Sequence, residues 1–404
     1  VGATVITMTL IALPSMLRQV YDTRLASGTI AASGTLGQII PPSIVLILLA
    51  DAISNASARA STSLGQAAMT VSVQDLFSGA LIPGLILVGG YLLWIAYKAH
   101  SDPASAPAIQ EENSIEFTKR QIAYGLGAPL LLIFAVLGSI LLGITPPTEA
   151  AAIGAGGAIL LAGLRLSEGR ASVSKTLILM GFFALLALLV LNGFSDLSLK
   201  RAEFSLSDIL RVSLAGLFTL SLFIALGAGL TALHRAGHLR SAFTSAAHIT
   251  SMVFTILIGA SLFALVFTGG YRGDEMIEAV LTSLPGGLWG AVFMTMLVIF
   301  LLGFFLDFIE IIFIVVPLVA PPLIVMGVDP IWLAILMALN LQTSFLTPPF
   351  GFALFYLRGT APDEVKTLDI WRGAIPFILI QLCVIALVAL LPGLATGLPE
   401  YLAE

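Results

Sequence analysis

A charge-free segment interrupted by two prolines constrains this chain more than any other feature. Residues 25–50 carry no charged side chain, and a run of that length can cross a bilayer as a helix. Its middle, residues 33–43, reads SGTLGQIIPPS. Because consecutive prolines remove two backbone donors and clash with the preceding turn, the sequence predicts two half-helices joined by an unwound segment. Irregular backbone at membrane depth is tolerated only where protein buries it or where it lines a wet cavity.

A second segment of the chain has the same design. Residues 330–357 are also free of charge, and residues 342–351 read QTSFLTPPFG. A shift of 307 positions relates the two segments, and it matches four pairs of residues: Pro14 and Pro321, Asp22 and Asp329, Pro41 and Pro348, and Pro42 and Pro349.

This common register predicts an internal repeat in which each copy holds one broken apolar segment. Paired Gly/Pro-interrupted spans in corresponding halves of a membrane protein indicate the binding site of a secondary transporter. The alternative interpretation is that both segments are proline-kinked helices that bind no ligand.

Composition places the chain in a membrane. Of its 404 residues 58% are hydrophobic and 10% are charged, whereas soluble domains contain about 25% charged residues. The net charge of −5, with basic residues scattered at the ends of apolar runs, gives no indication of nucleic-acid binding. The single cysteine, Cys383, excludes a disulfide within this sequence. Since the sequence starts at Val1 without a basic, signal-like region, we expect a further N-terminal part to precede it.

Alternation of apolar and polar stretches divides the chain into six segments with about eleven to thirteen membrane elements. The expected segments are 1–53, a first-repeat transport segment with a second hairpin arm and a broken helix; 54–122, a loop, a membrane span and a polar connector; 123–172, membrane spans with the TPPTEA motif; 173–240, two additional spans and a polar linker; 241–360, a second-repeat transport segment with the GASLF span, a hairpin and a broken helix; and 361–404, a C-terminal span.

The two interrupted segments supply groups that bind a bare cation. Unwound backbone offers carbonyl oxygens, and half-helix C-termini carry partial negative charge, so both suit Na⁺, which prefers hard oxygen ligands. Half-helix N-termini favour anionic groups instead. The predicted sodium ligands are Ser33, Gly34, Thr35, Gly37, Ile40 and Pro41 in the first segment, and Thr343, Ser344, Thr347 and Pro348 in the second.

Asp307 is the most informative single residue. It lies between the apolar runs 279–306 and 311–328, which we expect to form the arms of a re-entrant hairpin with Gly303 and Asp307 at its tip. Carboxylates inside a membrane are costly and usually functional. Under the shift of 307, the matching tip of the first segment would precede Val1. The alternative interpretation places Asp307 in an ordinary interfacial loop.

Enzyme chemistry finds little support in the sequence. His234 and His238 are four residues apart, but they lack the glutamate of a metalloprotease motif and no cysteine or carboxylate cluster accompanies them. An intramembrane enzyme that uses these histidines with Asp307 is one alternative class. A passive channel is another.

Five motifs occur in a fixed order along nearly the whole chain. They are SGTLGQIIPPS at 33–43, TPPTEAAAIGAGGA at 145–158, ILIGASLF at 256–263, GFFLD at 303–307 and LTPPFGFALF at 346–355. Together they resemble the large membrane subunit of the TRAP (tripartite ATP-independent periplasmic) transporters.

The resemblance implies an all-α elevator-type transporter with two inverted repeats, re-entrant hairpins and paired broken helices. It implies Na⁺-driven uptake of an organic acid across the bacterial inner membrane, with no cofactor besides the coupling ion and no enzymatic activity. A periplasmic substrate-binding protein and a small membrane subunit are the expected partners. A Na⁺/carboxylate transporter that needs no binding protein is the alternative. Residues 174–236 or thereabouts add two spans relative to shorter members of the family, and their role stays open.

Overall fold

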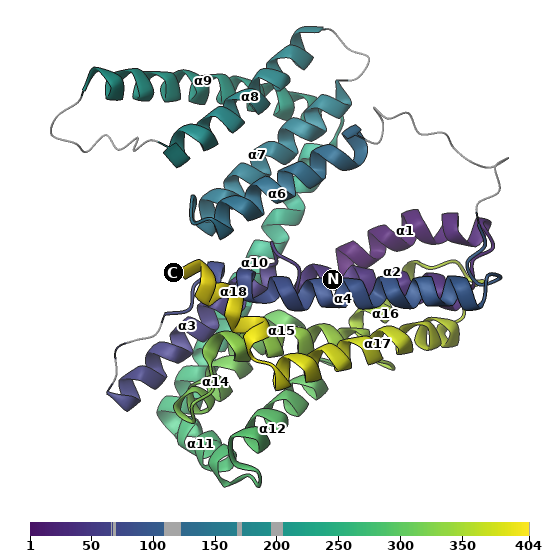
Figure 1. Cartoon of the computed structure of the whole chain (residues 1–404), viewed down its shortest axis with the longest axis vertical. Coiled ribbons are helices and arrows are strands. Elements are labelled where there is room, and N and C mark those ends of the chain that lie inside the picture. The colour runs from purple at the N-terminus through teal and green to yellow at the C-terminus, as the bar shows by residue number, and fades with distance from the viewer. Residues whose placement is uncertain (66, 68–69, 109–122, 168–171, 195–204, 404) are drawn as a thin grey trace. The chain divides into compact units, whose positions relative to one another are not determined.

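The computed structural model describes residues 1–65, 67, 70–108, 123–167, 172–194 and 205–403, and these contain helices but no strand (Figure 1). Within these ranges 8 helices are long and apolar enough to cross a membrane. Four shorter apolar helices accompany them. The polytopic, all-α class predicted from the sequence is therefore confirmed. Most of the predicted polar connector, residues 109–122, lies outside the described residues.

The chain divides into two compact units. Val1–Ser114 and Val253–Glu404 form the first unit although they come from opposite ends of the sequence, and Ile115–Met252 forms the second. Every predicted sodium ligand belongs to the first unit.

The first interrupted segment forms two helices with a break between them, as predicted. Asp22 starts the helix before the break, because its carboxylate accepts a hydrogen bond of 2.6 Å from the backbone N–H of Arg24. Ser43 starts the helix after the break by accepting from the N–H of Leu46 over 3.4 Å. The elements of this region are α1 (Gly2–Arg18), α2 (Thr23–Thr35), the 3₁₀ turn η1 (Leu36–Gln38), α3 (Ile44–Leu64) and α4 (Val73–Ser101).

α3 is longer than the sequence predicted. Small and polar residues from position 54 onward indicated a loop or interfacial stretch, but the helix continues to Leu64. It ends at Gly65, whose φ of 66° is the left-handed conformation that terminates many helices. Ser57 and Ala60 are buried, and α3 packs against α14 (Val316–Val325). The small side chains therefore serve close helix packing rather than a loop.

The region around Asp307 has two helical arms joined by a turn at residues 303–307, as predicted. The first arm is shorter than the predicted run 279–306, because the chain turns at Pro285 and Gly286, whose φ is 93°, and the arm begins only at Gly287. Asp307 starts the second arm, since its carboxylate accepts a hydrogen bond of 2.8 Å from the backbone N–H of Phe308. The elements that lead to the turn are η4 (Leu265–Gly270), α11 (Gly273–Ser283) and α12 (Gly287–Leu302), and those that follow it are α13 (Phe308–Glu310), η5 (Ile311–Val315) and α14.

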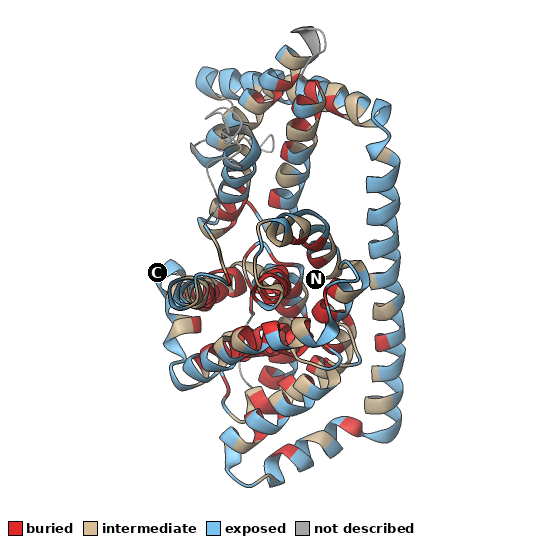
Figure 2. Ribbon diagram, turned by 90° about the vertical axis from the view of Figure 1, so that its right-hand side faces the viewer, coloured by how far each residue is buried: buried red, intermediate tan, exposed pale blue. Residues whose placement is uncertain are grey.

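α15 (Pro330–Leu346) is the central helix of the first unit, and every residue from Trp332 to Leu346 is buried. Figure 2 shows how buried positions gather among the inner helices. α15 contacts α2, α3, α4 and α12. Asn340 donates from Nδ2 to the carbonyl of Met296 on α12 over 2.7 Å. A helix that is apolar on all sides is expected at such a position. The elements that follow it are α16 (Phe352–Thr360), α17 (Thr367–Leu390) and α18 (Gly393–Ala403).

α2 and α17 cross at two glycines. A Cβ on Gly28 would collide with the carbonyl of Gly373, and a Cβ on Gly373 would collide with the carbonyl of Arg24. Small residues at such crossings let helix backbones approach closely in membranes. Arg24 Nε also lies 3.1 Å from Asp369 Oδ1, which joins the same two helices.

The second unit packs around α7, α8 and α9. Leu160, Leu164, Ile178 and Ala225 form its buried core. The two additional spans expected from the sequence correspond to α8 and α9, which are among the helices able to cross a membrane. The elements of this unit are η3 (Ala123–Gly127), α6 (Ala128–Leu141), α7 (Pro147–Leu166), α8 (Ser172–Phe194), α9 (Leu206–Arg235) and the first part of α10 (His238–Ala264).

Candidate functional site

The second break has a tightly packed backbone. α15 ends at Leu346, and the N–H of Gly351 donates to the carbonyl of Thr347 over 3.0 Å to close the turn around the prolines. A Cβ on Gly351 would lie 2.6 Å from the carbonyl oxygen of Phe345 and 2.9 Å from that of Thr347. Only glycine fits at this position, so the turn before α16 depends on it. The Pro348–Pro349 peptide bond is cis, as is Pro41–Pro42 in the first break.

Each of three hydroxyl groups at the second break donates to a backbone carbonyl three or four residues earlier. Thr343 donates to the carbonyl of Leu339 over 2.8 Å, and Ser344 donates to that of Leu341 over 2.8 Å. Thr347 donates to the carbonyl of Thr343 over 2.7 Å. Because a hydroxyl has one proton and two lone pairs, these three oxygens keep lone pairs available as acceptors. Such oxygens suit a cation rather than an anion.

The turn between α12 and α13 packs against this break. A Cβ on Gly303 would collide with Oγ of Ser344 and lie 2.8 Å from its Cβ. The ring centroids of Phe305 and Phe350 are 5.4 Å apart. The structure thus brings Gly303 and Ser344, two predicted sodium ligands from separate elements, into direct contact.

Asp307 lies at the far end of the same turn. It is partly buried, and its nearest described electrostatic neighbours include Glu310. No described hydrogen bond connects its carboxylate to Thr343, Ser344 or Thr347. Glu310 itself has one buried carboxylate oxygen without a hydrogen-bond partner among the described residues.

The first break resembles the second in its hydrogen bonding. Thr35 donates to the carbonyl of Ala32 over 2.8 Å, and Ser43 donates to the carbonyl of Gln38 over 2.5 Å. A Cβ on Gly34 would collide with Val5 of α1, so this glycine allows a close helix contact. The remaining predicted ligands differ in exposure: Ser33 and Ile40 are partly exposed, Gly37 is exposed and Pro41 is buried.

The two breaks meet at Thr35, a predicted sodium ligand, and at Gln342, which the sequence prediction left out. Gln342 donates from Nε2 to Oγ1 of Thr35 over 3.5 Å, and both side chains are completely buried. Gln342 immediately precedes Thr343 and Ser344, and a shift of 307 positions relates it to Thr35. That register could have identified Gln342 from the sequence. Tyr91 and Gln381, which adjoin it through α4 and α17, carry no comparable sequence signal.

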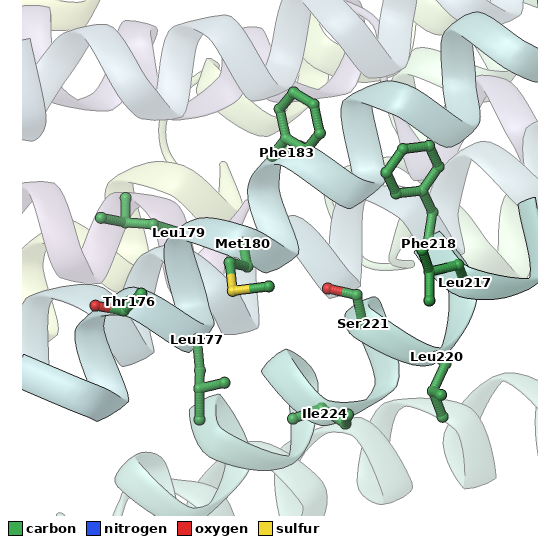
Figure 3. A pocket seen from close by; sticks show the side chains of 10 residues that line it. All are labelled: Thr176, Leu177, Leu179, Met180, Phe183, Leu217, Phe218, Leu220, Ser221 and Ile224. Atoms are coloured by element: carbon green, nitrogen blue, oxygen red, sulfur yellow. The ribbon is translucent and has the colours of Figure 1, made fainter. Parts of the chain in front are cut away.

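A large hollow elsewhere in the chain has a different character. An apolar groove of about 590 Å³ lies between α8 and α9 in the second unit (Figure 3). Met180, Phe183 and Phe218 line it, and only Thr176 and Ser221 contribute hydroxyls. It contains none of the predicted sodium ligands, and its lining suits hydrocarbon rather than an ion.

Among the described residues, acidic, histidine and cysteine side chains do not cluster in a way that would hold a metal. In the part of the chain that the structure describes, no three of them come together. The candidate sodium ligands are hydroxyl and carbonyl oxygens together with the single carboxylate of Asp307, and such oxygens suit a monovalent hard cation.

Interrupted helices that meet inside one unit of an all-helical membrane protein indicate a class, the permeases of membrane transport systems. The chain matches the family model described as "Tripartite ATP-independent periplasmic transporter, DctM component" over residues 1–394, and it belongs to this family. It is therefore the large permease component of a TRAP transporter, a multi-pass protein of the bacterial inner membrane and not an enzyme.

Alignments to the relatives cover almost the whole chain. The chain is 26% identical over 408 residues to the C4-dicarboxylate TRAP transporter large permease protein DctM of Rhodobacter capsulatus, covering 99% of this chain and 74% of the relative. It is 23% identical over 401 residues to the isethionate TRAP transporter permease protein DctMQ of Oleidesulfovibrio alaskensis, covering 97% and 48%. It is 23% identical over 385 residues to the sialic acid TRAP transporter permease protein SiaT of Haemophilus influenzae, covering 95% and 48%.

Proposed function

We propose that this permease imports an organic acid together with Na⁺ as the coupling ion. The observation that carries the proposal comes from the second break. There the hydroxyls of Thr343, Ser344 and Thr347 donate their hydrogen bonds to backbone carbonyls. Their lone pairs are left for a cation, and Gly303 from the neighbouring turn reaches Ser344.

The proposed sodium ligands are the predicted set, divided between two sites. At each site, hydroxyl and backbone carbonyl oxygens replace water around the ion. Asp307 would supply the negative charge that a monovalent cation needs in a medium of low dielectric. The first site draws on Ser33, Gly34, Thr35, Gly37, Ile40 and Pro41, and the second on Gly303, Asp307, Thr343, Ser344, Thr347 and Pro348.

We further propose that two inverted repeats build the transport domain. Under the shift of 307, α1 corresponds to η5 and α14, α2 to α15, and the start of α3 to α16. α1 packs against α16, whereas α14 packs against α3, so each hairpin arm contacts the half-helix of the other copy. A two-fold relation between the repeats accounts for this exchange. In the elevator mechanism proposed here, both breaks move together and carry ion and substrate across the membrane.

The proposed partners are a periplasmic substrate-binding protein and a small membrane subunit. The family is tripartite, and the relative in Oleidesulfovibrio alaskensis is named as a combined DctMQ permease of which this chain covers 48%. The proposed substrates are small organic acids, because the relatives are named for C4-dicarboxylates, isethionate and sialic acid. A cognate binding protein screened by thermal shift against these acids would identify the substrate.

Reconstituted uptake tests the proposal. Proteoliposomes with the permease and its small subunit should take up the acid only with the binding protein outside and a Na⁺ gradient directed inward. Equal uptake in K⁺ medium would contradict the sodium coupling. Uptake that persists without the binding protein would support the alternative, a Na⁺/carboxylate transporter that takes free substrate.

A further inference from the structure

Four polar side chains from four helices are buried together in the first unit. Thr35 belongs to α2, Tyr91 to α4, Gln342 to α15 and Gln381 to α17. Their exposed fractions are 0%, 3%, 0% and 1%, in the same order. Only Thr35 among them is a proposed sodium ligand.

Hydrogen bonds join these side chains in two pairs. Gln342 donates to Thr35 over 3.5 Å, and Gln381 donates from Nε2 to the hydroxyl of Tyr91 over 2.7 Å. The Tyr91 hydroxyl also interacts with the Gln342 side chain. The ring of Phe377 meets that of Tyr91 edge-on, with centroids 5.1 Å apart, so Tyr91 has little freedom to turn away. Gln342 is thus held from one side by α4 and α17 and faces the first break on the other.

Burial of the Gln342 and Gln381 side-chain amides costs free energy of desolvation. Oε1 of Gln342 and Oε1 of Gln381 are buried without a hydrogen-bond partner among the described residues. A leucine or methionine of similar volume would fill the same space without desolvating an amide. Their presence in so apolar a core therefore calls for a role other than packing.

We propose that Gln342 is a positioning residue that couples the two sodium sites, and this inference rests on the proposed function above. The Thr35 hydroxyl donates a hydrogen bond to the carbonyl of Ala32 and accepts one from Gln342. One lone pair of its oxygen remains, and the direction of that lone pair is set by Gln342. An ion bound to Thr35 therefore fixes the hydrogen bond between Thr35 and Gln342. Because Gln342 precedes Thr343 and Ser344 on α15, the same ordering prepares the second site. Each ion then strengthens the binding of the other.

Sodium binding without any organic substrate tests this coupling. The full transporter is titrated with Na⁺ alone as the probe, in a choline background at constant ionic strength. The wild type should bind Na⁺ with a Hill coefficient clearly above 1. Gln342→Leu should lower the coefficient to about 1 and raise half-saturation about fivefold or more, which is the lower end of usual coupling between sites.

Tyr91→Phe provides a second, milder variant. It removes the hydroxyl that accepts from Gln381 and interacts with Gln342, while keeping the ring that packs on Phe377. It should therefore reduce the Hill coefficient without unfolding the protein. Tyr97→Phe is its matched control, because Tyr97 is on the same helix but 62% exposed, and it should bind Na⁺ like the wild type. If Gln342→Leu does not fold, the Hill coefficient of Tyr91→Phe decides whether the two sites are coupled.

Three results have separate meanings. Wild-type Hill coefficients in the folded Gln342 and Tyr91 variants would overturn the coupling. A wild-type coefficient of about 1 would also overturn it and leave sodium binding itself intact. Absence of any Na⁺ binding by the wild type would contradict the proposed function rather than the coupling alone.

Discussion

Gln342 donates a hydrogen bond from its Nε2 to the hydroxyl of Thr35 over 3.5 Å, and the two residues stand 307 positions apart. The same separation relates the two proline pairs and the capping residues Asp22 and Asp329. Equivalent positions of two copies touch each other only near the axis that relates the copies. The contact therefore supports the proposed repeat. It is also the place where ion binding at one break can affect the structure of the other.

Removal of a single hydroxyl from the second break should weaken sodium binding. Thr347→Val keeps the shape of the side chain but loses the oxygen whose lone pairs are left for a cation. We expect half-saturation for Na⁺ to rise about tenfold, which corresponds to about 1.4 kcal/mol and is typical of one lost polar contact. Sodium-dependent uptake measured over a range of Na⁺ concentrations gives this value.

Thr360→Val is the matched control for that substitution. Its hydroxyl makes the same kind of bond, to the carbonyl of Tyr356 over 2.9 Å, but it lies at the end of α16 and outside the proposed site. Unchanged sodium dependence is expected for this variant. Equal effects of both substitutions would mean that helix perturbation, and not ligation, sets the result at Thr347.

The charge of Asp307 and its helix-capping role should be separable. Asp307→Ala removes both, whereas Asp307→Asn keeps an oxygen that can accept from the N–H of Phe308. We expect both variants to lose Na⁺-coupled uptake because the charge is gone. Only the alanine variant should also lose stability, by about 1 kcal/mol. Thermal unfolding in detergent and reconstituted uptake measure the two effects.

Asp363→Asn serves as the control for charge removal, since Asp363 is exposed in the turn between α16 and α17. Retention of wild-type sodium dependence by Asp307→Asn would count against a ligand at this position.

Local sequence signals predicted the breaks but not what surrounds them. The proline pairs and the carboxylate between two apolar runs act through the backbone within a few residues, so their effect can be read from the sequence. Burial of Ser57 and Ala60 depends on α14, which is some 260 positions away in sequence, so α3 was predicted too short. The roles of Tyr91 and Gln381 arise from packing between distant helices and have no local pattern.

Substitutions at Gly303 and Ser344 should affect stability in a coupled way, because the two residues are in steric contact. The φ of Gly303 is −63°, which any residue adopts, so Gly303→Ala should destabilise the protein only through its collision with Ser344. Overpacking of this kind costs about 1–3 kcal/mol. Addition of Ser344→Gly should restore part of that stability, because it removes the side chain that the new methyl group meets.

Uptake should not recover in the Gly303→Ala, Ser344→Gly double variant, because the proposed ligand at Ser344 is gone. Thermal unfolding of the two single variants and the double variant gives the interaction energy between the sites. Strictly additive losses of stability would show that the two residues do not meet in the way described.

The glycine crossing of α2 and α17 should control how the first break is held. Gly28→Ala would place a methyl group against the carbonyl of Gly373, a rigid backbone atom that cannot turn aside. We therefore expect a loss of about 1–3 kcal/mol in the free energy of unfolding. Because α2 carries Thr35 at its end, weaker sodium binding should accompany the loss.

Gly89→Ala on α4 is the control, since nothing lies within 4 Å of its Cβ position. That change should be neutral or stabilise the helix by about 0.5–1 kcal/mol. If both alanine variants unfold at the same temperature, α2 and α17 do not cross as closely as the two glycines indicate.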